Sequence, residues 1–109
     1  ITTSEDPQVY HCDMQKWAAM VYLTPNAPYD SGTRLHIHKE TGLFNGTQPE
    51  IGNAFAGGFY DSTKFDTLAM AGNVFNRLVI MDAQNIHSAG TYFGNSRETG
   101  RLVQLFFFD

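Results

Sequence analysis

Histidine and aspartate occupy alternate positions near the start of the sequence, in His11-Cys12-Asp13. We expect the segment from Gln8 to Asp13 to form a strand, and alternate residues of a strand project from the same face. The imidazole and the carboxylate can then reach one metal ion, while Cys12 points to the opposite face and packs there. Because His-x-Asp is common by chance, a metal site needs a third ligand from elsewhere.

A third ligand is available near the C-terminus, in Ile86-His87-Ser88-Ala89. Two imidazoles and one carboxylate form the facial triad of non-haem Fe(II) oxygenases, which leaves coordination positions open for a bidentate co-substrate and O2. The sequence therefore predicts an iron site made by His11, Asp13 and His87.

Arg101 begins the last apolar run and is charged where its neighbours are not. A guanidinium on an inward face is costly unless it meets an anion, and its planar fork suits a carboxylate. We expect Arg101 to bind a carboxylate of the co-substrate. A strand-end arginine that points to solvent is the simpler alternative.

A second set of imidazoles offers another metal site. His36 and His38 alternate in the expected strand Thr33 to His38 and could combine with His87, as in a cupin. That site would leave His11, Asp13 and Arg101 without roles. His36 and His38 could equally be surface histidines that follow a strand, and a non-catalytic binding module with the same fold is a third alternative.

Short β-rich runs bounded by Gly, Pro, Asn and Asp must position these residues, and this pattern is typical of an all-β sandwich or barrel with few helices. The range 42–72 is too long for a turn and is expected to be an insertion near the active-site mouth, with a short helix around Ser62 to Ala69. Strands are predicted at Gln8 to Asp13, Trp17 to Leu23, Thr33 to His38, Phe75 to Met81, Ile86 to Ala89 and Arg101 to Phe108.

The last predicted strand is apolar on both faces. Arg101, Leu105 and Phe107 share one face with Val103, and the other face carries Leu102, Gln104, Phe106 and Phe108. A sheet that is apolar on both faces needs cover on both. Because the sequence offers few helices and begins at Ile, we expect either missing N-terminal helices or a homo-oligomer.

Composition limits the remaining function classes. The 109 residues, with 42% hydrophobic residues and a net charge of -4, predict one domain over 1–109. Seven scattered Lys and Arg residues form no basic stripe for nucleic acid, and no apolar run approaches the roughly 18 residues of a membrane span. The single cysteine requires no oxidising compartment, so we expect a cytoplasmic protein.

These motifs, in this order, resemble the 2-oxoglutarate/Fe(II)-dependent dioxygenases of the prolyl-hydroxylase-like group. The resemblance covers nearly the whole chain. It is carried by His11-x-Asp13, the segments 18–25 and 31–35, His87, and Arg101-Leu102. Residues 75–80, His87-Ser88-Ala89 and Tyr92-Phe93-Gly94 look like an uncharacterised bacterial branch of the group.

The resemblance implies a double-stranded β-helix (a jelly roll, cupin-like) that binds Fe(II) through His11, Asp13 and His87. It implies that Arg101 holds the distal carboxylate of 2-oxoglutarate and that Tyr22 hydrogen-bonds the same carboxylate. The implied reaction couples oxidative decarboxylation of 2-oxoglutarate to hydroxylation of a small-molecule or peptidyl substrate by O2. Because Asp13 is a carboxylate, no ligand position is vacant for a halide, and hydroxylation is favoured over halogenation.

Overall fold

The computed structural model describes residues 8–109, which form two small antiparallel sheets. Short 3-10 helices lie at Tyr29–Ser31, Ile51–Phe55 and Ser62–Lys64. The strands are β1 (Trp17–Tyr22), β2 (Thr33–His38), β3 (Phe65–Ala71), β4 (Leu78–Asp82), β5 (His87–Ala89) and β6 (Val103–Phe108). The all-β class predicted from the sequence is confirmed.

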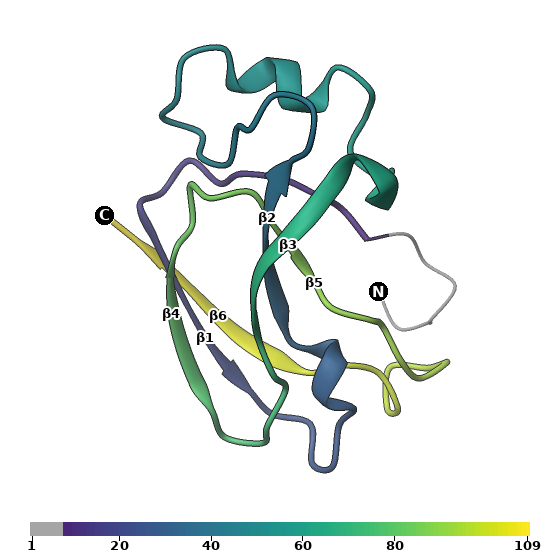
Figure 1. The fold of residues 1–109 in the computed structure, drawn as a ribbon. Coiled ribbons are helices and arrows are strands. Elements are labelled where there is room, and N and C mark those ends of the chain that lie inside the picture. Colours follow the sequence, from purple (N-terminus) through teal and green to yellow (C-terminus); the bar gives the residue numbers. More distant parts are fainter. Residues whose placement is uncertain (1–7) are drawn as a thin grey trace.

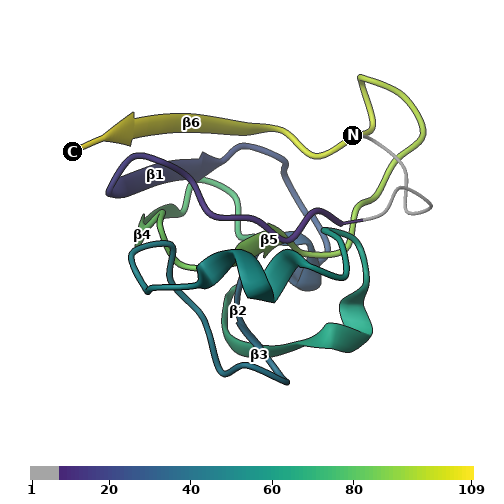
Figure 2. The same ribbon diagram turned by 90° about the horizontal axis from the view of Figure 1, so that it is seen from above.

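The strands alternate between the two sheets as the chain proceeds. The first sheet has the order β4-β1-β6 and the second the order β3-β2-β5. After the β2–β3 pair the chain passes to β4 in the first sheet, to β5 in the second and back to β6 in the first (Figure 1). Figure 2 shows the two sheets as layers, with β1 and β6 in one and β2 and β3 in the other.

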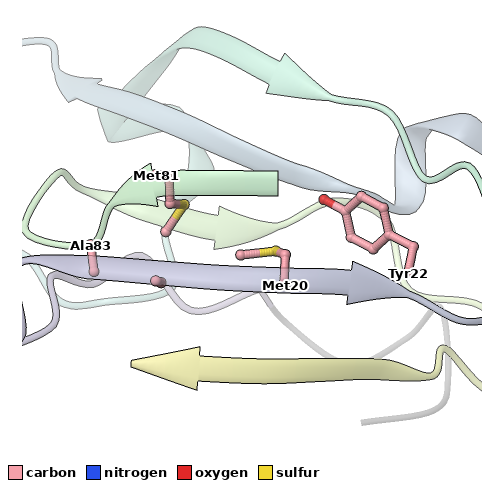
Figure 3. Close-up of a cluster of buried hydrophobic side chains, with 5 residues drawn as sticks. Met20, Tyr22, Met81 and Ala83 are labelled. Carbon is pink, nitrogen blue, oxygen red and sulfur yellow. The ribbon is translucent and has the colours of Figure 1, made fainter. Parts of the chain in front are cut away.

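The core between the sheets comes from the inward-facing residues of β1 and β4. Ala18, Met20 and Tyr22 alternate along β1 and are buried against Met81 and Ala83 (Figure 3). Side chains of a strand alternate between faces, so these three residues point to one side together. The alternation that predicted the strand therefore also builds the core.

A second core lies at one end of the second sheet, where β3 and β5 begin (Figure 1). Tyr10, Ala54, Phe65 and Ile86 are buried together, and Phe55 of the helix Ile51–Phe55 packs against them. The rings of Tyr10 and Phe65 stack with centroids 4.6 Å apart. This cluster attaches the segment before β1 and the long connection after β2 to the body of the domain.

Two local predictions were wrong. The helix expected around Ser62 to Ala69 is a single 3-10 turn at Ser62–Lys64 followed by β3, which pairs with β2. Leu68, Ala69 and Met70 favour helices in isolation, but pairing with β2 overrides that weak preference. The segment from Gln8 to Asp13 forms one bridge, between His11 and His87, and no longer strand.

Strand β6 lies at the edge of its sheet, and both of its faces are about half exposed. Leu105 and Phe107 line a pocket beside Ala18 and Met20, yet they are 51% and 48% exposed. Phe106 and Phe108, on the other face, are 49% and 44% exposed. The cover expected for this face is not provided by residues 8–109, and the predicted homo-oligomer stays a prediction. Within the same residues no helix is long and apolar enough to cross a membrane.

Two glycines let the connection before β2 lie close to other backbone, Gly90 to the connection after β5 and Gly32 to the end of β3. Gly90 N–H donates to Gly32 O over 2.7 Å, and Thr91 N–H donates to Asp30 O over 2.8 Å. A Cβ on Gly90 would lie 1.9 Å from Asp30 O, and one on Gly32 would lie 1.8 Å from Ala71 O. Because backbone fills both spaces, a side chain fits at neither position.

We predict that Gly90→Ala lowers the free energy of unfolding by about 3 kcal/mol, because the added methyl must push backbone apart. Gly52→Ala is the matched control, since a Cβ there meets nothing within 4 Å. Urea unfolding followed by circular dichroism measures both. Equal stability of the two variants would contradict the close contact at Gly90.

Candidate metal centre

His11, Asp13 and His87 form a compact group of donor atoms. One ligand atom from each lies within 4.8 Å of the others, and within residues 8–109 this is the one such group of three His, Cys, Asp or Glu side chains. His11 Nε2 lies 3.5 Å from one carboxylate oxygen of Asp13, and His87 Nε2 lies 3.3 Å from the other. The structure therefore brings together the three ligands predicted from the sequence.

Backbone hydrogen bonds position all three residues. His11 N–H donates to His87 O over 3.1 Å, and His87 N–H donates to His11 O over 2.9 Å. The two imidazoles consequently lie side by side, with ring centroids 4.2 Å apart. Asp13 N–H donates to Ala83 O over 2.9 Å, which fixes the carboxylate beside them.

Each imidazole of the group has its Nδ1 bound to a backbone carbonyl. His11 Nδ1 lies 3.0 Å from Val9 O, and His87 Nδ1 lies 2.8 Å from Asn85 O. A carbonyl only accepts, so each Nδ1 carries a proton, and Nε2 is the nitrogen of each ring that a metal ion near Asp13 would take. This is the tautomer and orientation that metal-binding histidines adopt in proteins. Burial lowers the pKa of His87, which favours the neutral form that binds metal.

The three residues line a pocket of about 140 Å³ between the sheets. One end of the pocket carries Arg101 and Thr33, and the remaining wall is mostly apolar. The other lining residues are Ala18, Met20, Met81, Ser88, Ala89, Leu105 and Phe107. The pocket thus combines an anionic donor group, a cation and an apolar wall.

Backbone carbonyls and an aromatic ring hold the guanidinium of Arg101. Its Nε donates to Ser31 O over 2.7 Å and its Nη2 donates to Gly32 O over 3.2 Å. Its Cζ lies 5.7 Å from the ring centroid of Tyr22. Burial lowers the pKa of Arg101, so an anion in this pocket would offset the cost of desolvating the charge. The solvent-facing alternative for Arg101 does not match its position.

Tyr22, expected beside the same carboxylate, is fully buried and does not line the pocket. Its hydroxyl lies 2.8 Å from Thr33 Oγ1, and Thr33 Oγ1 in turn donates to Met20 Sδ over 3.0 Å. Thr33 is the hydroxyl that lines the pocket. Tyr22 contacts Thr33 through this hydrogen bond. Direct contact of Tyr22 with a ligand stays a prediction.

The histidines of the alternative site contact other partners. His36 Nε2 lies 2.7 Å from Ser88 Oγ, and the His36 ring packs edge-on against Tyr10. His38 Nδ1 lies 2.8 Å from Thr41 Oγ1. Both imidazoles are buried, so neither is a surface histidine.

Cys12 lies between two members of the group. Burial raises the pKa of Cys12 to about 11, so the thiol stays protonated and packs as a small apolar side chain, as expected.

Two residues of the centre had no clear signal in the sequence. Asn85 acts through its backbone carbonyl, a group that every residue carries. Thr33 was expected only as the first residue of a strand. Their importance depends on which segments meet in three dimensions, and the structure supplies that information.

Comparison with the known protein families, with curated proteins and with solved structures gives no match for this chain. The function must therefore be argued from the geometry of the centre.

We predict that His36 makes the fold sensitive to acid. Burial lowers the pKa of His36 from 6.5 to about 4. Between these pH values the unfolded chain binds the proton and the folded chain does not. The contribution of His36 to stability is therefore fully present above pH 6.5 and is lost as the pH falls from about 6.5 to 4. The difference in pKa corresponds to at most about 3 kcal/mol.

The measurement is urea unfolding at several pH values between 4 and 7.5, for the unchanged protein and for His36→Gln. Glutamine keeps a side-chain amide near Ser88 but does not titrate. The variant should lose less stability on acidification. Parallel curves for both proteins would show that His36 is not the cause.

Proposed function

We propose that this chain is the catalytic core of an Fe(II)-dependent oxygenase that uses 2-oxoglutarate as co-substrate and hydroxylates a small-molecule or peptidyl substrate. The observation that carries the proposal is the shared pocket. Its wall holds two imidazole Nε2 atoms and a carboxylate at one place and the partly buried guanidinium of Arg101 at another.

The donor set suits a non-haem iron site. Two neutral imidazoles and one carboxylate are the ligands of the facial triad, which leaves open positions on the metal. A metal ion between the three groups would be within reach of the Nε2 atoms of both imidazoles, which lie 3.5 and 3.3 Å from the oxygens of Asp13. The bound Nδ1 atoms hold both rings ready for this ion.

The other end of the pocket suits a dicarboxylate. The volume of about 140 Å³ is room for about five waters at about 30 Å³ each, which a small ligand would displace. The keto acid end of 2-oxoglutarate would meet the metal, and its distal carboxylate would meet Arg101, with Thr33 Oγ1 as a neighbouring polar group. A charge-assisted bond of this kind is among the stronger hydrogen bonds in proteins.

When bound, iron and 2-oxoglutarate supply the oxidation: one atom of O2 enters succinate as CO2 leaves, and the other enters the substrate as a hydroxyl group. The chain's own residues bind and orient the reactants. The three candidate ligands, His11, Asp13 and His87, would hold the ion. Met20 and Met81, which are 5% and 8% exposed, form the buried apolar part of the pocket wall.

The strand order supports a double-stranded β-helix. In a jelly roll the chain passes repeatedly between two facing sheets, as it does here from β3 to β6. The His11 bridge would add the start of a further strand beside β5 in the second sheet. We propose that this segment is the counterpart of a strand in the complete jelly roll.

Anaerobic titration with Fe(II) and 2-oxoglutarate tests the proposal. We predict a weak visible charge-transfer band for the unchanged protein and its loss in His87→Ala. Removal of a residue that only hydrogen-bonds a metal ligand lowers metal affinity roughly 10- to 100-fold. Removal of the ligand His87 itself should lower it more.

His38→Ala is the matched control, because His38 is also a buried imidazole but bonds Thr41. It should keep the band. The cupin-type site would replace the oxygenase if two results came together. The unchanged protein would bind metal but show no band, and His36→Ala or His38→Ala would abolish metal binding as His87→Ala does. A folded protein that binds no metal would favour the non-catalytic module.

Arg101→Gln separates the co-substrate from the metal. We predict that this change raises the 2-oxoglutarate concentration for half-maximal band intensity about 10- to 100-fold, because it removes a charged hydrogen bond. Fe(II) affinity should stay the same. Arg34→Gln is the control, since Arg34 contacts Met70 outside the pocket. Equal 2-oxoglutarate affinity in both variants would contradict the role of Arg101.

A further inference from the structure

One polar connection links the metal centre to the long segment between β2 and β3. It begins at His87, whose Nδ1 donates to the carbonyl of Asn85 over 2.8 Å. That carbonyl and the N–H of Ile86 belong to the same peptide unit, and Ile86 N–H donates to Phe44 O over 2.7 Å. The direction of the carbonyl therefore depends on the segment around Phe44.

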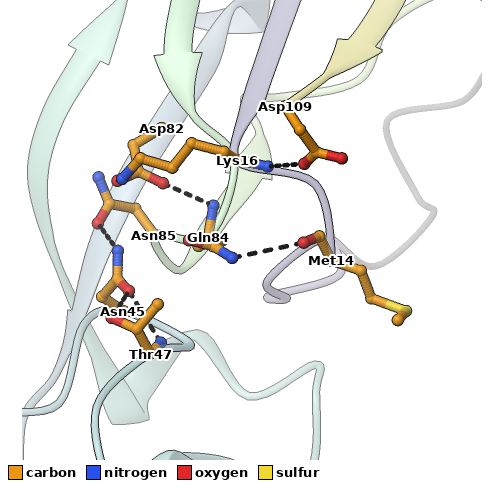
Figure 4. Close-up of polar contacts among 8 residues, drawn as sticks. All are labelled: Met14, Lys16, Asn45, Thr47, Asp82, Gln84, Asn85 and Asp109. Carbon is orange, nitrogen blue, oxygen red and sulfur yellow. Dashed lines mark hydrogen bonds and ion pairs between the residues drawn. The ribbon is translucent and has the colours of Figure 1, made fainter.

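The side chains of Asn45 and Asn85 reinforce this contact. Asn45 Nδ2 donates to Asn85 Oδ1 over 2.8 Å (Figure 4). The residues also form an isolated β-bridge, and Gly46 N–H donates to Gln84 O over 2.7 Å. Asn45 is 9% exposed, so water competes little for its amide.

The orientation of the Asn45 amide is determined by its neighbours. Asn45 Oδ1 accepts from Thr47 N–H over 2.9 Å and from Thr47 Oγ1 over 2.6 Å. A backbone N–H can only donate, so the oxygen must face Thr47 and the amide nitrogen must face Asn85. The turn 45–48 is closed by Gln48, whose Oε1 accepts from Phe44 N–H and Asn45 N–H over 2.8 and 2.9 Å. Asn45 is thus held on both sides.

The other imidazole of the centre has similar backbone support. His11 Nδ1 bonds the carbonyl of Val9, and the N–H of the same peptide unit, that of Tyr10, donates to Phe59 O over 2.8 Å. Each histidine therefore bonds the carbonyl two residues before it, in a peptide unit that a distant segment holds. The His87 side differs in its added side-chain hydrogen bond, between Asn45 and Asn85.

We propose that Asn45 is a positioning residue for the metal ligand His87 and acts through Asn85. The inference rests on the metal site of the proposed function. Asn45 fixes the Asn85 peptide, the Asn85 carbonyl fixes the proton on Nδ1, and the lone pair of Nε2 then points at the metal position. Partners of this kind orient metal-binding histidines and raise their affinity for the metal.

A double-mutant cycle on Co(II) binding tests the proposal. The four proteins are the unchanged chain, Asn45→Ala, Asn85→Ala and the double variant. Asn85→Ala keeps the backbone carbonyl that His87 bonds. We expect each single change to weaken Co(II) affinity about 10- to 100-fold and to alter the visible Co(II) absorption. The double variant should be little weaker than either single variant, because both changes remove the same link.

Asn53→Ala is the matched control, since Asn53 is an exposed asparagine in the same long segment. It should bind Co(II) as the unchanged protein does. An unchanged affinity and spectrum in Asn45→Ala, or single effects that multiply in the double variant, would overturn the proposal. A variant that is merely less stable would bind Co(II) with an unaltered spectrum in its folded fraction, which also counts against it.

A second readout needs no metal. Long-range proton–nitrogen spectra of the metal-free protein report which imidazole nitrogen of His87 carries the proton. We expect Nδ1 in the unchanged chain and a mixture of tautomers in Asn45→Ala. If the unchanged protein binds no Co(II), the metal site of the proposed function fails, while these spectra still decide whether Asn45 positions His87.

Discussion

The pair of backbone hydrogen bonds between His11 and His87 is the contact on which the rest of the centre depends. It joins the segment before β1 to β5, which lie far apart in the sequence. Directly opposed residues of an antiparallel pair point their side chains to the same face. The two imidazoles therefore meet, and Asp13, one alternation further along, meets them both.

The fold supplies the other side of the pocket through an equally close approach. Gly90 allows the connection after β5 to touch the connection before β2, and Gly32 allows the latter to touch the end of β3 at Ala71. The carbonyls of Ser31 and Gly32 at this crossing accept from Arg101. The distance between the guanidinium and the imidazoles is consequently set by backbone contacts and depends little on flexible side chains.

Strand positions and the triad could be read from the sequence because they obey local rules. The alternation in β1 and β6 and the spacing of His11 and Asp13 each need only a few neighbouring residues. The failures were non-local. Residues 65–71 contain good helix formers but are drawn into the sheet by β2. The place of Thr33 in the pocket lining, with its hydroxyl 2.8 Å from the Tyr22 hydroxyl, had no local signal. The role of Asn45 depends on a carbonyl forty residues away in the chain, at Asn85.

The bridge at His11 is isolated, with no ladder of neighbouring pairs on either side. The same segment is also held by the hydrogen bonds from Tyr10 N–H to Phe59 O and from Asp13 N–H to Ala83 O, over 2.8 and 2.9 Å. Two of the three candidate ligands therefore lie on a short segment held by a few separate hydrogen bonds, which opens more readily than a full strand. An ion that binds only the closed form holds that form in place by mass action. If the centre binds a metal ion, amide exchange at His11 and His87 would slow as the site fills and would report its occupancy.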